Sequence, residues 1–298
     1  MKRKLFSFAD SRLSASLERV RAQALALNFF DEISVLTEDA LDPDFKKRWA
    51  HVMIPGTRGF GYWVWKPVII LQELMKMDEG DHLYYIDAGC HLNPRGIKRL
   101  KEYDEMCAKS ACGIVATVIA YTEKSYTKAD LFDYMGVIDN EDITNTHQVQ
   151  SGIIFIRKCR LSIELLQQWG AVWEHDIHLI DDSPSKLPND ASFVEHRHDQ
   201  SVFSILCKLN KATLIDAEEV EPPVDQPRNI ENWKKMKHLP ILAMRDRPIP
   251  AKLKRKIRKY RFYASLHLGS FSQKYQDKLT KLYQTTPCLM DPLPYLQD

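Results

Sequence analysis

The segment Tyr84-Tyr85-Ile86-Asp87-Ala88-Gly89-Cys90-His91-Leu92-Asn93 decides the fold class and marks a candidate site. An apolar run typical of a buried strand ends in the carboxylate of Asp87, and small residues follow it. In an open α/β sheet, ligands bind at the carboxyl ends of the strands. Asp87 is therefore placed to hold a metal ion or a cation bound to a diphosphate. The structural alternative is an aspartate that caps the turn, and this segment alone does not separate the two.

Strand and helix patterns alternate on both sides of this segment. Strands are predicted at 5–9, 32–36, 82–86, 112–119, 152–156 and 212–215, and helices at 17–27, 68–77, 94–106, 160–175 and 200–209. The run 112–119 is apolar throughout, as expected for a strand buried on both faces. The β-α-β-α-β order predicts an α/β fold with a Rossmann-type, mostly parallel sheet flanked by helices.

Length and composition predict an ordinary soluble globular protein. The chain has 298 residues, of which 44% are hydrophobic and 28% charged, enough to bury a full core. Residues 5–9 after the basic start predict a first strand and not a signal peptide. The longest near-continuous apolar stretch, 113–121, is too short to span a bilayer. The six cysteines lack CxxC spacing, so we expect reduced thiols in the cytoplasm.

The pattern changes after Pro250. Seven of the ten residues 252–261 are Lys or Arg, although the whole chain has a net charge of only +2. We therefore divide the chain into a catalytic domain, 1–250, and a basic helical extension, 251–298. Segment 252–263 suits an anionic membrane surface, and the alternative is a solvated charged helix packed on the domain. Nucleic acid is not an expected partner, because the chain lacks helix-turn-helix, RRM and finger patterns.

Several common catalytic motifs are absent from the sequence. No G-x-G-x-x-G follows the first predicted strand, and neither a Walker A motif nor a G-x-S-x-G nucleophile elbow occurs. A dinucleotide oxidoreductase, a P-loop enzyme and an α/β-hydrolase are therefore disfavoured. The candidate chemistry lies instead in four segments, of which the Asp87 turn is one.

A second segment is Gly59-Phe60-Gly61-Tyr62-Trp63-Val64-Trp65-Lys66-Pro67. Its glycines permit a tight loop, its aromatic side chains offer flat surfaces, and Lys66 stands immediately before a predicted helix. A cation beside the positive end of a helix is unfavourable unless a phosphate occupies the same place. In the structural alternative, Trp63 and Trp65 are core anchors and Lys66 extends to solvent.

The other two segments carry polar side chains at the start of a strand and of a helix. In segment 147–152, Gln150 and Ser151 are suited to bind hydroxyls, although polar residues are common at strand starts. In segment 195–200, His198 or Asp199 suits a helix N-cap. A cap does not explain the two histidines and the arginine around Asp199, which suit acid/base chemistry.

These residues occur in a familiar order. Trp-Lys-Pro (65–67), Tyr-Tyr-Ile-Asp-Ala-Gly (84–89), Gln-Ser-Gly-Ile-Ile-Phe-Ile-Arg (150–157) and His-Asp-Gln (198–200) follow an N-terminal strand–helix–strand half. Over residues 1–247 the chain resembles GT-A-type nucleotide-sugar glycosyltransferases, especially bacterial ones that build lipopolysaccharide, capsule or other surface glycans. The resemblance implies a hexosyltransferase-like enzyme with a UDP- or GDP-linked donor and a glycan or lipid-linked acceptor. It also implies a cytoplasmic protein peripherally associated with the inner membrane.

The resemblance leaves metal dependence open. GT-A enzymes usually hold a divalent cation with an Asp-x-Asp motif, and here Asp87 matches the first carboxylate while Gly89 stands at the second. Mn²⁺ or Mg²⁺ needs several oxygen ligands, so Asp87 would require help, for which His91 and His198 are candidates. The metal-free alternative neutralises the leaving diphosphate with Lys66, an arginine such as Arg245 or Arg247, and backbone N–H groups.

The resemblance also implies roles for single residues. Asp199 is the first choice as base in an inverting reaction, with Asp87 and His198 as further catalytic candidates. In a retaining reaction, Gln150 or Asp199 lies on the other face of the sugar, and both outcomes stay open. The donor-binding candidates are Ala9, Asp10, Arg12, Lys66, Asp87, Ala88 and Gly89, and the sugar- or acceptor-binding candidates are Trp65, Gln150, Ser151, Gln200 and Arg245. The alternatives are a nucleotidyltransferase and a non-catalytic sugar-nucleotide-binding or membrane-adaptor protein.

Overall fold

Six strands form one central sheet in the order β2-β1-β3-β6-β5-β7. Their bounds are β1 Arg3–Phe8, β2 Glu32–Leu36, β3 His82–Ile86, β5 Ile114–Thr122, β6 His147–Arg157 and β7 Thr213–Ile215. β6 is antiparallel to both of its neighbours, and the other five strands share one direction. The predicted α/β fold with a mostly parallel sheet is confirmed. The sequence does not indicate that β6 runs antiparallel to its two neighbours.

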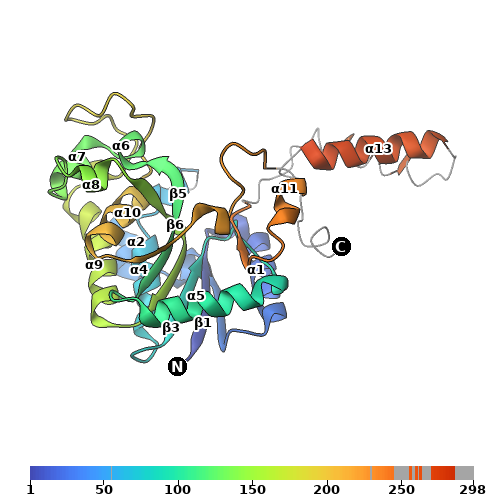
Figure 1. Ribbon diagram of the computed structural model, residues 1–298. Helices are drawn as coiled ribbons and strands as arrows, with labels where there is room; N and C mark the ends of the chain where they lie inside the picture. The colour runs from blue at the N-terminus through green and yellow to red at the C-terminus, as the bar shows by residue number, and fades with distance from the viewer. Residues whose placement is uncertain are drawn as a thin grey trace.

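The computed structural model describes residues 1–54, 56–228, 230–244, 255–256, 259–260, 262–263 and 270–285. Helices cover both faces of the sheet (Figure 1). One layer contains α1 (Ser14–Leu27) and α5 (Ile97–Lys109), and the other contains α2 (Pro43–Trp49), α4 (Lys66–Met75), α9 (Arg160–His175) and α10 (Asp199–Leu209). The remaining elements are α3 Gly59–Tyr62, β4 His91–Leu92, α6 Glu123–Tyr126, α7 Ala129–Tyr134, α8 Glu141–Thr144, α11 Ile230–Lys235, β8 Ile241–Leu242 and α13 Ser270–Thr285.

The alternation of side chains along each strand builds the two cores. Leu5 and Tyr84 pack with α1 and α5, whereas their neighbours Phe6 and Tyr85 pack with α4, α9 and α10. All four are fully buried. A strand buried on both faces reads as a continuous apolar run, which is the pattern that the sequence shows before Asp87.

The reversal of β6 follows from its connection to β5. The intervening residues 123–146 form the short helices α6, α7 and α8 and lead into β6 from the end of the sheet at which β5 finishes. The first residues of β6 therefore lie at the same edge as the carboxyl ends of the five parallel strands. This geometry brings Gln150 and Ser151 towards the turn after β3.

The C-terminal extension is described only in part. Residues 270–285 form the helix α13, which lies apart from the helical layers of the sheet (Figure 1). Half of the basic segment 252–263 lies outside the described residues. None of the described helices has the length and apolar character required to cross a bilayer.

A buried polar cluster joins the amino end of β3 to α5. Asp104 accepts hydrogen bonds from the His82 imidazole at 2.5 Å, the Tyr84 hydroxyl and the Arg3 guanidinium at 2.9 Å. Burial by itself raises the pKa of a carboxyl. Here the three donors outweigh burial, so the pKa of Asp104 is lowered to about 2.

Replacing Asp104 with asparagine is expected to lower the free energy of unfolding at neutral pH by about 2 kcal/mol. A carboxyl with a lowered pKa in the folded state stabilises the fold above its unfolded pKa of 3.8, and the effect fades as the pH falls toward 2. Urea unfolding of both proteins at neutral pH and near pH 3 measures this. The difference should shrink at the lower pH, and an equal difference at both would contradict the assignment.

Candidate active site

Four residues from the segments that the sequence singles out meet at the carboxyl edge of the sheet. Asp87 follows β3 directly, Lys66 opens α4 and Asp199 opens α10. Ser151 lies in the first half of β6. Lys66 and Ser151 are 85 positions apart in the chain, and Ser151 and Asp199 are 48 apart, yet their side chains are in contact. We call these four residues the charged cluster.

The Lys66 ammonium lies within this cluster and points inward. Its Nζ is 3.3 Å from Asp87 Oδ1 and 3.2 Å from Asp199 Oδ2, and it donates to Ser151 Oγ at 3.2 Å. The side chain is 2% exposed, so the alternative in which Lys66 extends to solvent is wrong. Burial lowers the pKa of an ammonium, but the two carboxylates outweigh burial and raise the pKa of Lys66. The side chain is therefore a buried cation.

Asp87 lies between the buried cluster and solvent. The Tyr85 hydroxyl donates to Asp87 Oδ1 at 2.7 Å, and the Asp87 backbone N–H donates to the Gly152 carbonyl at 2.8 Å. The Asp87 side chain remains 39% exposed. Gly152 gives the carboxylate its room, because a Cβ there would lie 2.9 Å from Asp87 Oδ2. Asp87 is thus oriented by the protein and still accessible to a ligand.

Replacing Gly152 with alanine is expected to lower turnover by about 10-fold, because the Asp87 carboxylate must move by a few tenths of an ångström and a misplacement of about 1 Å costs about 100-fold. The new methyl group pushes the Asp87 carboxylate out of its position, while the fold is retained. Gly170→Ala, inside α9, is the matched control. A Cβ at Gly170 would make only an ordinary contact of 3.9 Å with Pro67 of α4. Equal activity of the Gly152 and Gly170 variants would show that the position of the Asp87 carboxylate does not affect turnover. Turnover of a nucleotide-sugar donor is the measurement.

Asp199 is the buried carboxyl of the cluster. The Ser151 hydroxyl donates to its Oδ2 at 2.8 Å, and the Trp169 indole N–H donates to its backbone carbonyl at 2.9 Å. Burial raises the pKa of Asp199 to about 6, against the opposing effects of the Lys66 charge and the Ser151 hydrogen bond. Such a carboxyl exchanges a proton near neutral pH, as a general base requires.

The aromatic segment before Lys66 forms a left-handed turn. Five consecutive residues, 59–63, have φ between 52° and 87°, and three of them are not glycine. Each of those three costs about 1–2 kcal/mol in this conformation. Strain of this kind persists where the surroundings impose it, and it is concentrated at ligand and active sites. The turn places the Trp63 ring 5.8 Å from Lys66 Nζ.

His198 is buried beside this turn and does not join the charged cluster. Its ring packs against Tyr62 and Trp63, with centroid distances of 5.2 and 5.7 Å, and its Nδ1 donates to the Ile180 carbonyl at 2.6 Å. Burial lowers the pKa of His198. No hydrogen bond or ion pair connects the described side chains of His198 and Asp87. A metal site shared by these two residues stays a prediction.

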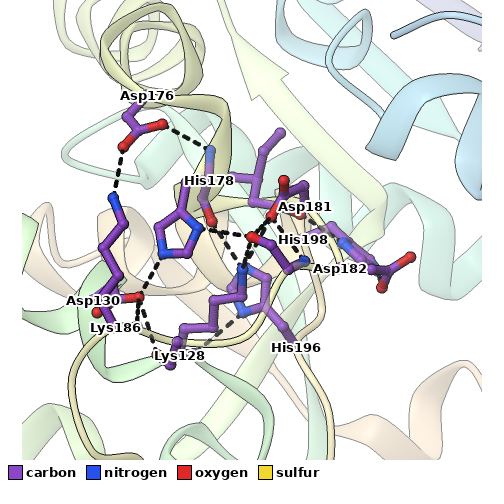
Figure 2. Close-up of polar contacts among 12 residues, drawn as sticks. Lys128, Asp130, Asp176, His178, Asp181, Asp182, Lys186, His196 and His198 are labelled. Carbon is purple, nitrogen blue, oxygen red and sulfur yellow. Dashed lines mark hydrogen bonds and ion pairs between the residues drawn. The ribbon is translucent and has the colours of Figure 1, made fainter.

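A polar network anchors the loop that leads to His198 and Asp199 (Figure 2). Lys128 donates through Nζ to the His178 carbonyl at 2.8 Å and pairs with Asp181 at 3.1 Å. The His178 imidazole lies 2.7 Å from Asp130 Oδ2, and the Lys128 backbone N–H donates to the ring of His196 at 3.2 Å. These contacts hold the loop against α7 and so fix the entry into α10. The sequence contains no local signal for this network.

The predicted donor-binding residues at the end of β1 lie beside the Asp87 turn. Ala9 packs in one small cluster with Ala88 and Leu17. Asp10 accepts two hydrogen bonds from the Arg12 guanidinium, at 2.6 and 3.0 Å, and the Arg12 side chain is half exposed. The structure therefore brings the ends of β1 and β3 together, as the prediction requires.

Arg19 is a site residue that the sequence did not indicate. From α1 it donates to the carbonyls of Ala88 and Cys90, at 2.7 and 2.8 Å. It thereby fixes the turn after Asp87. An arginine inside an amphipathic helix carries no signal of such a contact, because its partner is about 70 positions away.

The remaining predicted residues have different outcomes. Trp65 is 4% exposed, packs on Phe8 and donates its indole N–H to the Gly59 carbonyl, so it is a core residue and not a surface for sugar. Gln200 is partly exposed, and its amide donates to Gln148 at 2.9 Å. Gln150 is 9% exposed, and its Nε2 has no hydrogen-bond partner among the described residues. Arg245 lies outside the described residues.

No protein-family model matches the chain, and no curated protein matches it. Among solved structures, it is similar to the galactosyltransferase LgtC in complex with donor and acceptor sugar analogs, with a TM-score of 0.45, 11% identity, and coverage of 95% of this chain and 96% of that chain. It is also similar to a glycosyltransferase involved in the glycosylation of the major capsid of PBCV-1, with a TM-score of 0.41, 9% identity, and coverage of 81% of this chain and 94% of that chain. A third similar structure is mouse xyloside xylosyltransferase 1, with a TM-score of 0.39, 12% identity, and coverage of 74% of this chain and 86% of that chain. These similarities are too remote to assign an activity, which must be argued from the site.

Proposed function

We propose that the protein is a glycosyltransferase that moves a sugar from a nucleoside diphosphate to an acceptor hydroxyl. The observation that carries the proposal is the charged cluster, in which an ammonium lies between an exposed and a buried carboxylate at the carboxyl edge of an α/β sheet. Glycosyl transfer needs a carboxylate that accepts a proton and charged groups that face an oxocarbenium-like transition state. The cluster supplies both.

Three residues of the cluster act on the acceptor in this reaction. Asp199 takes the proton of the acceptor hydroxyl, whose oxygen forms the new bond to the anomeric carbon as the bond to the diphosphate breaks. Lys66 and Ser151 hold Asp199 in place through contacts of 3.2 and 2.8 Å. The donor nucleotide lies along the ends of β1 and β3, next to Ala9, Arg12 and the turn after Asp87.

The finer identity of the substrates follows from the sequence resemblance. The donor is a UDP- or GDP-linked hexose, and the acceptor is a glycan or a lipid-linked saccharide of bacterial surface polysaccharide synthesis. The basic segment 252–263 docks the enzyme on the anionic inner face of the membrane. Deletion of residues 251–298 is expected to lower binding to anionic vesicles in a sedimentation assay more than it lowers donor hydrolysis. Unchanged vesicle binding would contradict the membrane role.

Thermal stabilisation by nucleotides tests the proposed activity directly. The full chain is screened with nucleoside diphosphates and nucleotide sugars, and slow hydrolysis of the donor is followed in parallel. A ligand that binds only the folded state raises the melting temperature. Stabilisation together with hydrolysis supports the transferase. Stabilisation without turnover on any acceptor indicates a non-catalytic sugar-nucleotide-binding protein, and no stabilisation by any nucleotide contradicts the proposal.

A further inference from the structure

The two carboxylates of the charged cluster already share a cation, which is the Lys66 ammonium. Nζ is almost equidistant from Asp87 Oδ1 and Asp199 Oδ2, at 3.3 and 3.2 Å. We propose that Lys66 takes the place that a divalent ion holds in metal-dependent nucleotide-sugar transferases, so that this enzyme binds its donor and turns over without Mn²⁺ or Mg²⁺. The inference rests on the proposed function, and it decides between the two routes that the sequence leaves open.

The donor set at Asp87 does not fit a divalent ion. Mn²⁺ and Mg²⁺ require several oxygen ligands. Oδ1 of Asp87 is engaged by the Tyr85 hydroxyl and by Lys66, and Oδ2 of Asp199 is engaged by Ser151 and Lys66. Gly89 stands where a second carboxylate of an Asp-x-Asp motif is expected. Within the described part of the chain, no group of three or more His, Cys, Asp or Glu side chains is arranged to hold a metal ion.

The two histidines that the sequence offers as additional ligands are used elsewhere. His91 is buried in β4, where its Nδ1 lies 3.3 Å from the Gln23 amide on α1. His198 donates to the Ile180 carbonyl and packs against Tyr62 and Trp63. These contacts fix both rings, and the remaining nitrogen of His198, Nε2, lies 3.6 Å from Asp182 and not beside Asp87. Among the described residues, no histidine is therefore grouped with Asp87 as a metal ligand.

The ammonium is held firmly in the place of the ion. The rings of Trp63, Trp65 and Tyr85 lie 5.7 to 5.9 Å from Lys66 Nζ, a distance at which a ring face attracts a cation. A divalent ion that approached Asp87 would meet this fixed positive charge and be repelled. Without a metal, the exposed part of the Asp87 carboxylate is left to accept hydrogen bonds from sugar hydroxyls, as charge-assisted acceptors do.

Metal removal tests the inference on the unmodified chain. Calorimetric titration with UDP and GDP, and hydrolysis of the donor found in the screen, are measured after dialysis against EDTA and again with added Mn²⁺ or Mg²⁺. We expect dissociation constants and rates that differ by less than about threefold between the buffers. A loss of tenfold or more in EDTA that Mn²⁺ restores would overturn the inference and leave the proposed function standing, since tenfold corresponds to the removal of a real interaction. Absence of nucleotide binding in every buffer would overturn both.

A lysine variant adds a second readout. Lys66→Met is expected to lower hydrolysis at least about 100-fold in EDTA and in Mn²⁺ alike, because the charge opposite the carboxylates is removed. Lys76→Met, at the exposed residue directly after α4, is the control and is expected to retain full activity in both buffers. Recovery of the Lys66 variant by Mn²⁺ to near wild-type rates would show that a metal serves this site. Since Lys66→Met also lowers stability, its fold is checked by circular dichroism, and the EDTA comparison on the wild type decides by itself if the variant does not fold.

Discussion

Replacing Asp199 with asparagine is expected to lower turnover by about three orders of magnitude, because general bases contribute about 10²- to 10⁴-fold. The amide has the size of the carboxyl and retains an oxygen for the Ser151 hydroxyl, but it does not take up a proton at neutral pH. The fold should be preserved, since Lys66 keeps the Asp87 carboxylate as a counter-charge at 3.3 Å. Single-turnover transfer with the donor found in the screen measures the loss.

Asp44→Asn is the matched control for this variant. Asp44 also lies in the first turn of a helix, α2, but it is exposed and has no contact with the charged cluster. Both substitutions remove a negative charge from the first turn of a helix, so both remove a favourable interaction with the helix dipole. Near-normal turnover of the Asp199 variant, or an equal loss in both variants, would remove Asp199 from the chemistry.

The pH dependence of the wild type follows from the same carboxyl. A base works in its deprotonated form, and burial raises the pKa of Asp199 to about 6. The rate is therefore expected to rise with pH and to reach half its plateau near pH 6, about two units above the value for an ordinary aspartate. Since its folded-state pKa is raised, the ionised carboxylate also opposes folding, and this loss of stability develops as the pH rises from 3.8 through 6. A midpoint near pH 4 would contradict the assignment.

Replacing Lys66 with methionine is expected to cause the largest loss of stability of any single change in the site, ~3–5 kcal/mol at neutral pH. Methionine fills a similar volume, but it leaves the buried Asp199 carboxylate without its counter-charge. The negative charge of Asp87 then lies nearby with no cation between the two carboxylates. The loss should be smaller below pH 6, where Asp199 takes up a proton. Urea unfolding at neutral and mildly acidic pH measures this. A loss that is independent of pH would contradict the ion-pair explanation.

The double variant Lys66→Met/Asp199→Asn separates the charge from the packing. Removing both partners of a buried pair is commonly far less costly than removing one. We therefore expect the double variant to regain most of the stability that Lys66→Met loses, while remaining inactive. Losses that simply add would show that the two side chains do not interact. Lys76→Met serves as the control for removal of an exposed lysine next to α4.

Local sequence patterns predict the positions of most strands and helices. The apolar runs of β1, β3 and β5 and the proline that starts α4 are determined by contacts within a few residues, so their positions were predicted to within a few residues. The direction of β6 was not predicted, because it depends on how residues 123–146 return across the end of the sheet. A single strand looks the same in sequence whichever way it is inserted, since its side chains alternate with a period of two in either direction.

The candidate site shows the same division. Lys66, Asp87, Ser151 and Asp199 were all identified from their positions before or after predicted elements. Trp65 was assigned to sugar binding because aromatic side chains suit that role, but its burial makes it part of the core. The sequence does not indicate Arg19 as a site residue, because the turn that it holds lies about 70 positions away. Tyr85 stands only two positions before Asp87, but its contact with the carboxylate becomes visible only in the folded strand.

The sequence alone therefore determined which residue types stand at the ends of which strands and helices, because period, turn residues and helix starts are local properties. Only the tertiary structure decided that one ammonium lies between two carboxylates that are far apart in the chain. Coulombic and hydrogen-bond energies depend on distance and burial, which a linear order does not contain. The sequence of the Asp87 segment supplies one of the two carboxylates of an Asp-x-Asp motif. The folded chain places the Lys66 ammonium 3.3 Å from that carboxylate.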